Sequence, residues 1–357
     1  MDFTFTDDQQ MLIEGVATLL RKEVTAEQIR ASWNLDGSDP QLWRQLVELG
    51  IPAILVPEAQ GGLGLNELDF IRIAEECGRV ALAEPIVEMA MVATPMLVQL
   101  AEHSEQCAEL LEEIAGGDAR VAVGHPINPT VADAQIADWL LLPHGHEVHL
   151  VPSDSVALTV QESLDPSRRL FTVDWDGSSS TYCVAEEQLG AELWADALNR
   201  GALLNAALLI GLTQGMIEQS VIYTTDREQF GRPIGANQAV KHHMANCAVK
   251  TEFTKPVIYR AGYEISRRSQ RSAVAVSHAK VAAGESALLT AKNSIQVHGA
   301  MGYTWECNLQ IWAKRAWALN TSWGDAGFHK NRIHDWLMDE HVPLGAENTF
   351  SQQVAVG

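Results

Sequence analysis

Residues Tyr223–Gln238 read Y-T-T-D-R-E-Q-F-G-R-P-I-G-A-N-Q, and about sixty residues later Gln296–Tyr303 read Q-V-H-G-A-M-G-Y. The guanidinium of Arg227 offers a planar fork that matches the oxygens of a pyrophosphate. Phe230 supplies an apolar face for an adenine or ribose, and Gly231 lets the backbone come close to a ligand. The first stretch is therefore interpreted as a turn that can hold a nucleotide.

The residues around these turns add further contacts. Gln238 lies one short turn into the next predicted helix and offers an amide, and Gln296 lies at a predicted helix end. Gly299 removes a side chain where a ligand would press against the backbone. For the first turn taken alone, a plain helix terminus with a hydrophobic staple is the alternative.

Taken together, the two turns resemble the paired flavin-binding signatures of the acyl-CoA dehydrogenase family. In that family an Arg-x-Gln-Phe-Gly turn and a Gln-x-x-Gly-Gly-x-Gly-Tyr turn hold the ADP half of FAD, mainly the FAD of the neighbouring subunit. Ala300 replaces the second of the paired glycines, a small change that we expect to be tolerated. The resemblance implies cofactor-binding roles for Arg227, Gln229, Phe230, Gln238, Gln296, Gly299 and Ala300.

Composition predicts a soluble, cytoplasmic protein of two or three domains. The chain has 357 residues, of which 46% are hydrophobic and 20% charged, as is usual for globular proteins. It has no run of about eighteen apolar residues, and its N-terminus is acidic, so we expect neither a membrane partner nor a signal peptide. The five cysteines are scattered and never form a Cys-x-x-Cys pair, which argues against a zinc or disulfide framework.

The net charge of −21 makes a nucleic-acid partner unfavourable, because the field of the protein repels phosphates. A coenzyme A ligand would need a local basic patch. Two interpretations of the densest one are open, a coenzyme A contact or a solvated helix end; its residues are Lys250, Lys255, Arg260, Arg267, Arg268 and Arg271.

Three segments follow one another along the chain. Residues 1–117 show helical spacing, with Thr6 as a predicted N-cap and a helix stopped at Gly50 and Pro52. Residues 118–188 form a small β domain, and residues 189–357 hold four long helices, with a kink expected at Pro256. We therefore predict an α+β fold of the acyl-CoA dehydrogenase type: an N-terminal helical domain, a small middle β domain and a C-terminal four-helix bundle. The predicted strands are 119–123, 139–142, 148–151, 156–160, 170–173 and 181–184, and the predicted bundle helices are 202–221, 236–268, 273–297 and 310–319.

The resemblance also identifies a missing group. Family members need a carboxylate that takes a proton from the carbon next to the thioester. The first family position for this base matches Trp323, whose indole N–H cannot accept a proton, and the second matches Gly201. No catalytic residue is therefore assigned. Asp325 and Asp196 are the nearest carboxylates in sequence, and they are either displaced bases or solvated helix-terminal acids.

The middle segment departs from the family in the same direction. Active members carry a Thr-Glu-Pro-x-x-Gly-Ser-Asp-like loop and a Trp-Ile-Thr-like strand against the flavin ring. This chain has V-G-H-P-I-N-P-T at 123–130 and D-W-L-L at 138–141, so only Pro126 clearly survives. The groups that a subunit lends to a neighbour are kept, whereas those for its own flavin ring are lost.

From this asymmetry we predict the non-catalytic subunit of a heteromeric acyl-CoA dehydrogenase. It would share FAD with a catalytic partner in a heterotetramer that desaturates an acyl-CoA, and an electron-transfer flavoprotein would be the acceptor. The arrangement resembles bacterial α2β2 enzymes of steroid catabolism that act on side-chain CoA thioesters. Two alternatives are a self-sufficient homotetramer with a displaced base and a non-enzymatic scaffold with the same fold.

Other clusters are open to more than one interpretation. The segment His144–His149 holds three histidines and one glutamate; it is interpreted as a polar hairpin tip, with zinc ligation by His144 and His146 as the alternative. No metal site is assigned. His242 and His243 are predicted to be a helix-surface pair near the cofactor. Subunit packing is preferred over a sterol site for five tryptophans, namely Trp305, Trp312, Trp317, Trp323 and Trp336.

Overall fold

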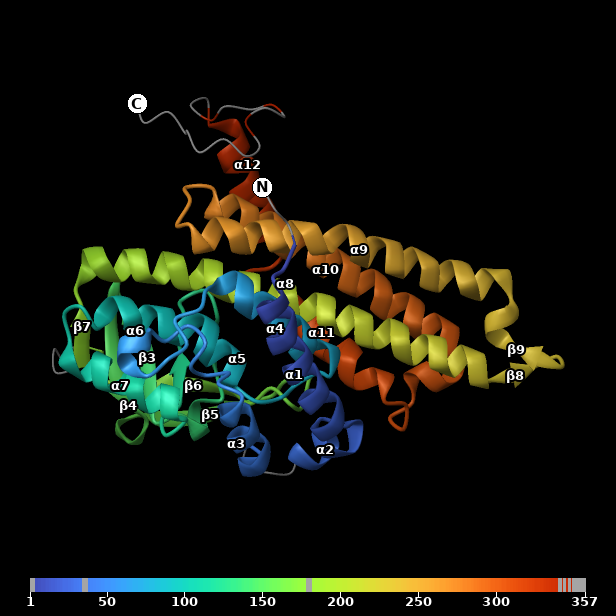
Figure 1. Ribbon diagram of the computed structural model, residues 1–357, viewed down its shortest axis with the longest axis horizontal. Helices are drawn as coiled ribbons and strands as arrows, with labels where there is room; N and C mark the ends of the chain where they lie inside the picture. The colour runs from blue at the N-terminus through green and yellow to red at the C-terminus, as the bar shows by residue number, and fades with distance from the viewer. Residues whose placement is uncertain are drawn as a thin grey trace.

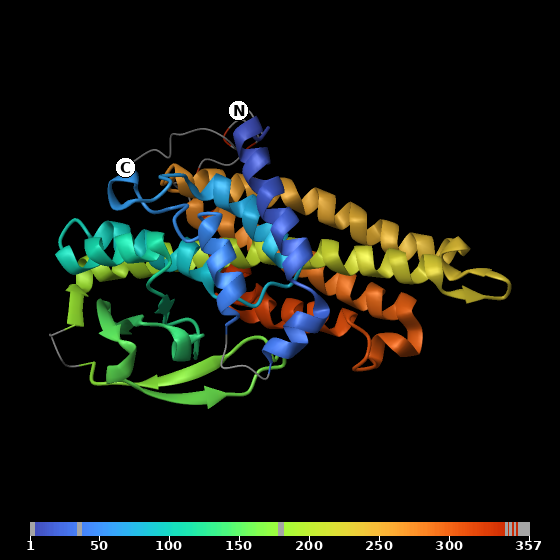
Figure 2. The same cartoon turned by 60° about the horizontal axis from the view of Figure 1, so that its bottom comes forward.

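The computed structural model describes residues 4–33, 38–177 and 182–339, together with residues 342, 345 and 348. Three long helices run along the longest axis of the molecule (Figure 1). Strands cluster at one end of these helices, and a short hairpin projects from the other end (Figure 2). The long helices are α8 (Glu187–Asp226), α9 (Gln238–Ser266) and α10 (Ser272–His298).

The N-terminal region is helical, as predicted. Its first helix begins with a capping box, in which the Thr6 side chain accepts from the backbone N–H of Gln9 and the Gln9 side chain accepts from the backbone N–H of Thr6. The helix that the sequence stops at Gly50 ends there, with Gly50 at a φ of 74°. The elements are α1 (Asp7–Glu23), α2 (Ala26–Ser32), α3 (Pro40–Glu48), η1 (Glu58–Gln60), α4 (Glu67–Arg79), α5 (Ile86–Glu88), η2 (Met89–Ala93), α6 (Thr94–Leu100) and α7 (Glu105–Gly116).

The middle region forms two small sheets. One has the strand order β1-β3-β4-β7 and the other has the order β2-β6-β5. Each of the six predicted runs overlaps a strand, and a seventh, short strand, β2, was not predicted. Residues 178–181, where the last run begins, lie outside the described part. The strands are β1 (Val121–Val123), β2 (Val131–Ala132), β3 (Trp139–His144), β4 (Glu147–Pro152), β5 (Ala157–Gln161), β6 (Leu170–Asp174) and β7 (Cys183–Ala185).

The C-terminal region holds the predicted long helices with different limits. The first starts at Glu187 rather than near residue 202, and α9 continues through Pro256 as one helix. A further helix follows the predicted fourth one. The remaining elements are β8 (Glu228–Gln229), β9 (Arg232–Pro233), η6 (Ile234–Ala236), η7 (Gly299–Tyr303), α11 (Leu309–Thr321) and α12 (Ala326–Met338).

The N-terminal region packs directly on the bundle through close contact of α4 with α8. A Cβ placed on Gly211 would lie 1.9 Å from the carbonyl oxygen of Glu75, and one on Gly78 would lie 2.2 Å from that of Leu208. Only glycine permits this approach. Helix α8 is long and apolar enough to cross a membrane, but 83% of its most apolar window is buried inside the protein. It is therefore the core helix on which the other elements pack.

Candidate functional site

The first signature forms an exposed hairpin at the end of α8. Phe230 and Gly231 are its central residues, with φ values of 54° and 75°, both positive as a type I′ hairpin turn requires. A phenylalanine tolerates positive φ poorly, yet its ring is 100% exposed. Arg227 and Gln229 are also exposed on this hairpin. The hairpin therefore carries a guanidinium, an amide and an aromatic ring at the surface of the chain.

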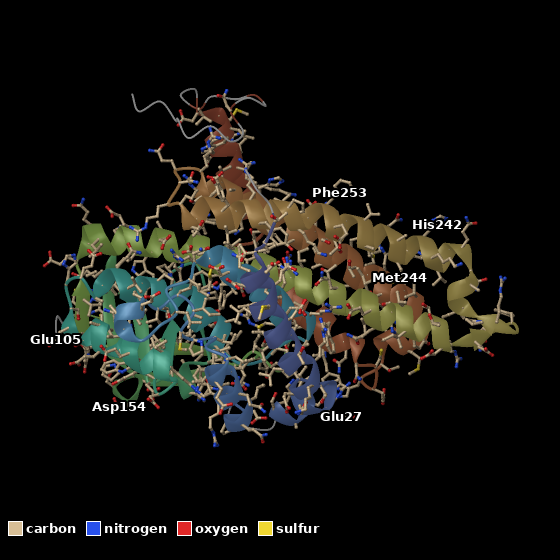
Figure 3. All side chains as sticks on the ribbon, in the orientation of Figure 1. Glu27, Glu105, Asp154, His242, Met244 and Phe253 are labelled. Carbon is tan, nitrogen blue, oxygen red and sulfur yellow. The ribbon has the colours of Figure 1, made fainter. Side chains whose placement is uncertain are left out.

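The second signature lies at the same end of the bundle. The ring of Tyr223 stacks on His298, with centroids 4.3 Å apart and an interplanar angle of 18°. The Tyr223 hydroxyl also donates to the carbonyl of His298. These contacts connect the start of the first signature to the turn where α10 ends. His242 and Met244, at the start of α9, lie at this end too (Figure 3).

The second turn is open to a ligand. Gln296, Gly299 and Ala300 are exposed, and Gly299 has a φ of 60°. Among the described residues, no atom outside the immediate neighbours lies within 4 Å of a Cβ built at Gly299 or at Gly231. Gln238 is the first residue of α9 and is exposed. The structure thus places all seven predicted residues at one exposed end of the bundle, where these open turns leave room for the ADP half of FAD that the resemblance implies.

The two positions that the sequence comparison matched to the family's base, 201 and 323, touch each other beside α8. Trp323 is only 1% exposed, and a Cβ on Gly201 would lie 2.1 Å from its indole ring. The indole therefore occupies the space in which a side chain at position 201 would stand. The indole of Trp323 fits against α8 only because residue 201 is glycine and has no Cβ.

Trp323 is held from several sides. Its backbone N–H donates to the Asn128 side chain at 2.9 Å, and its carbonyl oxygen lies 2.9 Å from Nε2 of His329. The ammonium of Lys280 donates to three carbonyls of the preceding and following turn, those of Leu319, Asn320 and Gly324. Burial lowers the pKa of Lys280 to about 7 and that of His329 to about 4. The loop that carries Trp323 is therefore fixed rather than open.

The β-domain loop that departs from the family closes on the same tryptophan. His125 lies with its ring 5.2 Å from the indole of Trp323 and 5.6 Å from Trp194. Its Nε2 lies 2.9 Å from the carbonyl oxygen of Trp194. The loop at 123–130, which the sequence comparison matched to the flavin-ring loop of active members, thus packs into an aromatic cluster.

Sequence reasoning missed one acid at this place. Glu88 ends α5, and its side chain lies beside that of Trp323, with which it lines the same cavities. Burial raises the pKa of Glu88 to about 7. The available signal was a single acid inside the apolar run Ile86–Ala93.

Glu88 borders two small cavities beside Trp323. One has a volume of about 250 Å³ and is also lined by Asn128 and Arg168. The other, of about 60 Å³, shares Glu88, Arg168 and Trp323. Sites for small ligands usually measure roughly 300–1,000 Å³. The two cavities are therefore too small to hold a flavin ring together with an acyl group.

The two carboxylates considered from sequence have other partners. Asp325 caps α12, since its side chain accepts from the backbone N–H of Phe328 at 2.8 Å. Asp196 accepts from Nε of Arg200 at 2.6 Å, and the same guanidinium also binds Glu67. Both acids thus have the helix-terminal or ion-paired surroundings of structural groups.

The remaining candidates divide between core and surface. Trp312 is buried and donates to the carbonyl of Arg79, whereas Trp305 and Trp317 are exposed. In the basic patch described in the sequence, Lys250 pairs with Glu285 at 3.2 Å and Lys255 pairs with Glu252 at 2.6 Å. His242 is exposed, and Nδ1 of His243 lies 2.9 Å from Oδ1 of Asn293.

Family models define the class of protein. The model of the acyl-CoA dehydrogenase C-terminal domain matches residues 189–338, and that of the N-terminal domain matches residues 6–118. The chain therefore belongs to the acyl-CoA dehydrogenase family, whose members are FAD-dependent oxidoreductases that act on acyl-CoA.

Individual relatives agree with this assignment. The chain is 32% identical to the acyl-CoA dehydrogenase IpdE2 of Mycolicibacterium smegmatis over 315 residues, which cover 87% of this chain and 93% of that protein. A chain of the ChsE4-ChsE5 complex from Mycobacterium tuberculosis superimposes with a TM-score of 0.83 at 22% identity, covering 96% of this chain and 100% of that one. A chain of the Tcur3481-Tcur3483 steroid ACAD gives 0.80 at 21% identity, covering 92% and 97%. The two solved structures confirm the predicted fold.

Proposed function

We propose that this chain is the non-catalytic subunit of a heteromeric FAD-dependent acyl-CoA dehydrogenase. The observation that carries the proposal is the contact of Trp323 with Gly201. The indole of Trp323 stands at one position where the family carries its base and fills the space beside the other, Gly201. Neither position can therefore abstract a proton. The catalytic carboxylate then belongs to a partner subunit.

The open hairpin supports a shared cofactor. Arg227 would bind the pyrophosphate of FAD, and Phe230 would cover its adenine or ribose. Gln229, Gln238, Gln296, Gly299 and Ala300 would complete this half of the site. The bound flavin accepts the hydride that leaves the substrate. This chain contributes binding and orientation of the nucleotide, while the ring lies in the partner.

The outer faces of α9 and α10 support association with another subunit. Val249 and Phe253 lie one helical turn apart on α9 and are 56% and 77% exposed. Phe253 projects from the outer side of the bundle (Figure 3). Leu288 and Leu289 are exposed on α10. Such large exposed apolar side chains are typical of surfaces that a partner covers.

The proposed reaction is α,β-desaturation of an acyl-CoA. A steroid side-chain CoA thioester is the proposed substrate class, since the chain resembles the two-gene steroid dehydrogenases and a chain of a solved steroid ACAD shares its fold. The proposed assembly is a cytoplasmic heterotetramer with a catalytic homologue. An electron-transfer flavoprotein is the proposed acceptor.

Flavin stoichiometry tests the proposal directly. The chain is expressed alone and together with a homologue that carries the catalytic glutamate. We expect the isolated chain to be colourless and the complex to hold one FAD per pair of unlike subunits. A yellow isolated chain that reduces a dye with acyl-CoA would contradict the division of roles.

The substitution Arg227→Ala in the complex separates a shared cofactor site from a mere scaffold. Because a hydrogen-bonded charged group contributes about 1.5–3 kcal/mol, FAD affinity should fall roughly tenfold or more. Arg44→Ala is the matched control, since Arg44 is an exposed arginine on α3, outside both signatures. Full flavin content in both variants would favour the scaffold.

One observation favours the self-sufficient alternative. Glu88 offers a carboxyl beside Trp323 with a pKa raised to about 7, which suits a general base. In that alternative Glu88, rather than Asp325 or Asp196, would be the displaced base. The small cavities weigh against it, because the acyl chain has no room beside the indole.

A further inference from the structure

A cluster of two histidines and one glutamate lies in the β domain, apart from both sites described above. His144 ends β3, Glu147 begins β4, and the two residues pair across the hairpin. His149 follows Glu147 by two residues, so both side chains lie on the same face of β4. The hairpin turn at Gly145, with a φ of 61°, carries His146 outside this group. The histidine partner of His144 is therefore His149. The sequence spacing had suggested His146 instead.

The three side chains converge on a common point. Oε2 of Glu147 lies 2.9 Å from Nε2 of His149 and 3.5 Å from Nδ1 of His144. The three ligand atoms all lie within 4.8 Å of one another. Ligand atoms about 2.0–2.2 Å from a tetrahedral zinc ion are themselves roughly 3.3 Å apart. The two measured distances lie on either side of that separation.

The surroundings of the three residues hold His149 in place and leave the side of His144 open to solvent. His149 is only 1% exposed, and the ring of Trp175 packs against it with centroids 5.1 Å apart. Its Nδ1 has no hydrogen-bond partner among the described residues. His144 is exposed, and the group borders a hollow of about 1150 Å³. Further acids line this hollow and make it attractive to a cation, namely Glu186, Glu187 and Glu192.

We propose that His144, Glu147 and His149 form a divalent-metal site that takes Zn²⁺, with a water molecule from the hollow as the fourth ligand. Two imidazoles and one carboxylate are a common donor set for zinc with one open position. The thiol of Cys183 lies nearby and donates to the carbonyl of Ala185 at 3.4 Å, so it is not assigned as a ligand. The site would tie the tip of the β3–β4 hairpin to the buried part of β4.

Zinc titration of the untagged full-length chain tests this site. Calorimetry with Zn²⁺ should show one equivalent bound per chain and a raised melting temperature. His144→Ala and Glu147→Gln should each weaken binding roughly 100-fold, since loss of a ligand costs at least as much as loss of a group that orients one. His144 is exposed at the hairpin tip, so its variant should remain folded.

His146→Ala is the matched control. It removes an exposed imidazole two residues from His144 without touching the group of three. Unchanged zinc affinity in this variant, together with loss in His144→Ala, supports the site. Absence of stoichiometric uptake, or equal weakening by both substitutions, overturns it and leaves a hydrogen-bonded polar hairpin tip.

Discussion

Two regions along helix α8 differ in exposure and packing: its C-terminal end near Arg227 and the stretch around Gly201. At its C-terminal end, the hairpin beyond Arg227 exposes an aromatic ring on backbone of positive φ. Near Gly201, on the same helix, the buried indole of Trp323 fills the space beside the backbone. Strained and exposed backbone is retained where a ligand uses it, whereas dense packing serves stability. Under the proposed function, the end at Arg227 binds the nucleotide and the end at Gly201 is structural.

Removing the buried indole should have the largest effect. Trp323→Ala deletes a buried tryptophan and should lower the free energy of unfolding by about 3–5 kcal/mol. If the ring end is only structural, the complex that does form should still bind FAD. Trp317→Ala is the control, because Trp317 is 37% exposed. Chemical denaturation measures the stability, and the flavin content measures FAD binding. Loss of flavin without loss of stability would mean that Trp323 serves the cofactor site rather than the packing.

Phe230→Gly examines the open end. Glycine adopts positive φ freely, so the stability of the chain should stay constant or rise. Loss of the aromatic face should weaken FAD binding in the complex roughly threefold to tenfold, as expected for an aromatic contact of about 0.5–1.5 kcal/mol. Fluorescence titration of the apo-complex with FAD measures this. Unchanged affinity would remove Phe230 from the nucleotide site.

Glu88→Gln tests whether the acid beside Trp323 is structural or catalytic. The pKa of Glu88 is raised to about 7 in the folded chain, whereas an ordinary glutamate has a pKa of about 4.3 when unfolded. The unfolded chain therefore ionises first, and the stability that this group contributes is complete below about pH 4 and lost as the pH rises to about 7.

The melting temperature of the wild-type chain should accordingly fall relative to Glu88→Gln between pH 5 and pH 7.5. If the base lies in the partner, as proposed, the complex should keep its dehydrogenase activity in this variant. A Glu88→Gln complex that folds but is inactive would favour the self-sufficient alternative. Parallel melting curves would show that Glu88 does not titrate in this range.

Asp325→Asn should have the smallest effect. Asparagine caps helices about as well as aspartate, so stability should change by about 0.5 kcal/mol or less, whereas Asp325→Ala should cost about 1 kcal/mol. Activity of the complex should be unchanged in both variants, since Asp325 accepts a hydrogen bond at the start of α12. Steady-state dye reduction measures this, and an inactive Asn variant would identify Asp325 as a base.

Much of the fold was predictable because its signals are local. The cap at Thr6, the stop at Gly50 and the six predicted β runs each depend on a few neighbouring residues. The limits of α8 were harder to predict. Its first turns carry polar residues between the apolar ones, and their packing against β4 and β7 decides that they are helical. The site signatures were also local, since each is one turn.

The amino-acid sequence by itself determined the family, the order of the three regions, the two turns proposed to bind a nucleotide and the absence of an acid at positions 201 and 323. Only the tertiary structure decided that these two positions touch, that Glu88 reaches Trp323, and that His144 meets His149. The physical reason is range. Caps, turns and periodicity depend on neighbours along the chain, whereas contacts between distant segments depend on how whole elements pack.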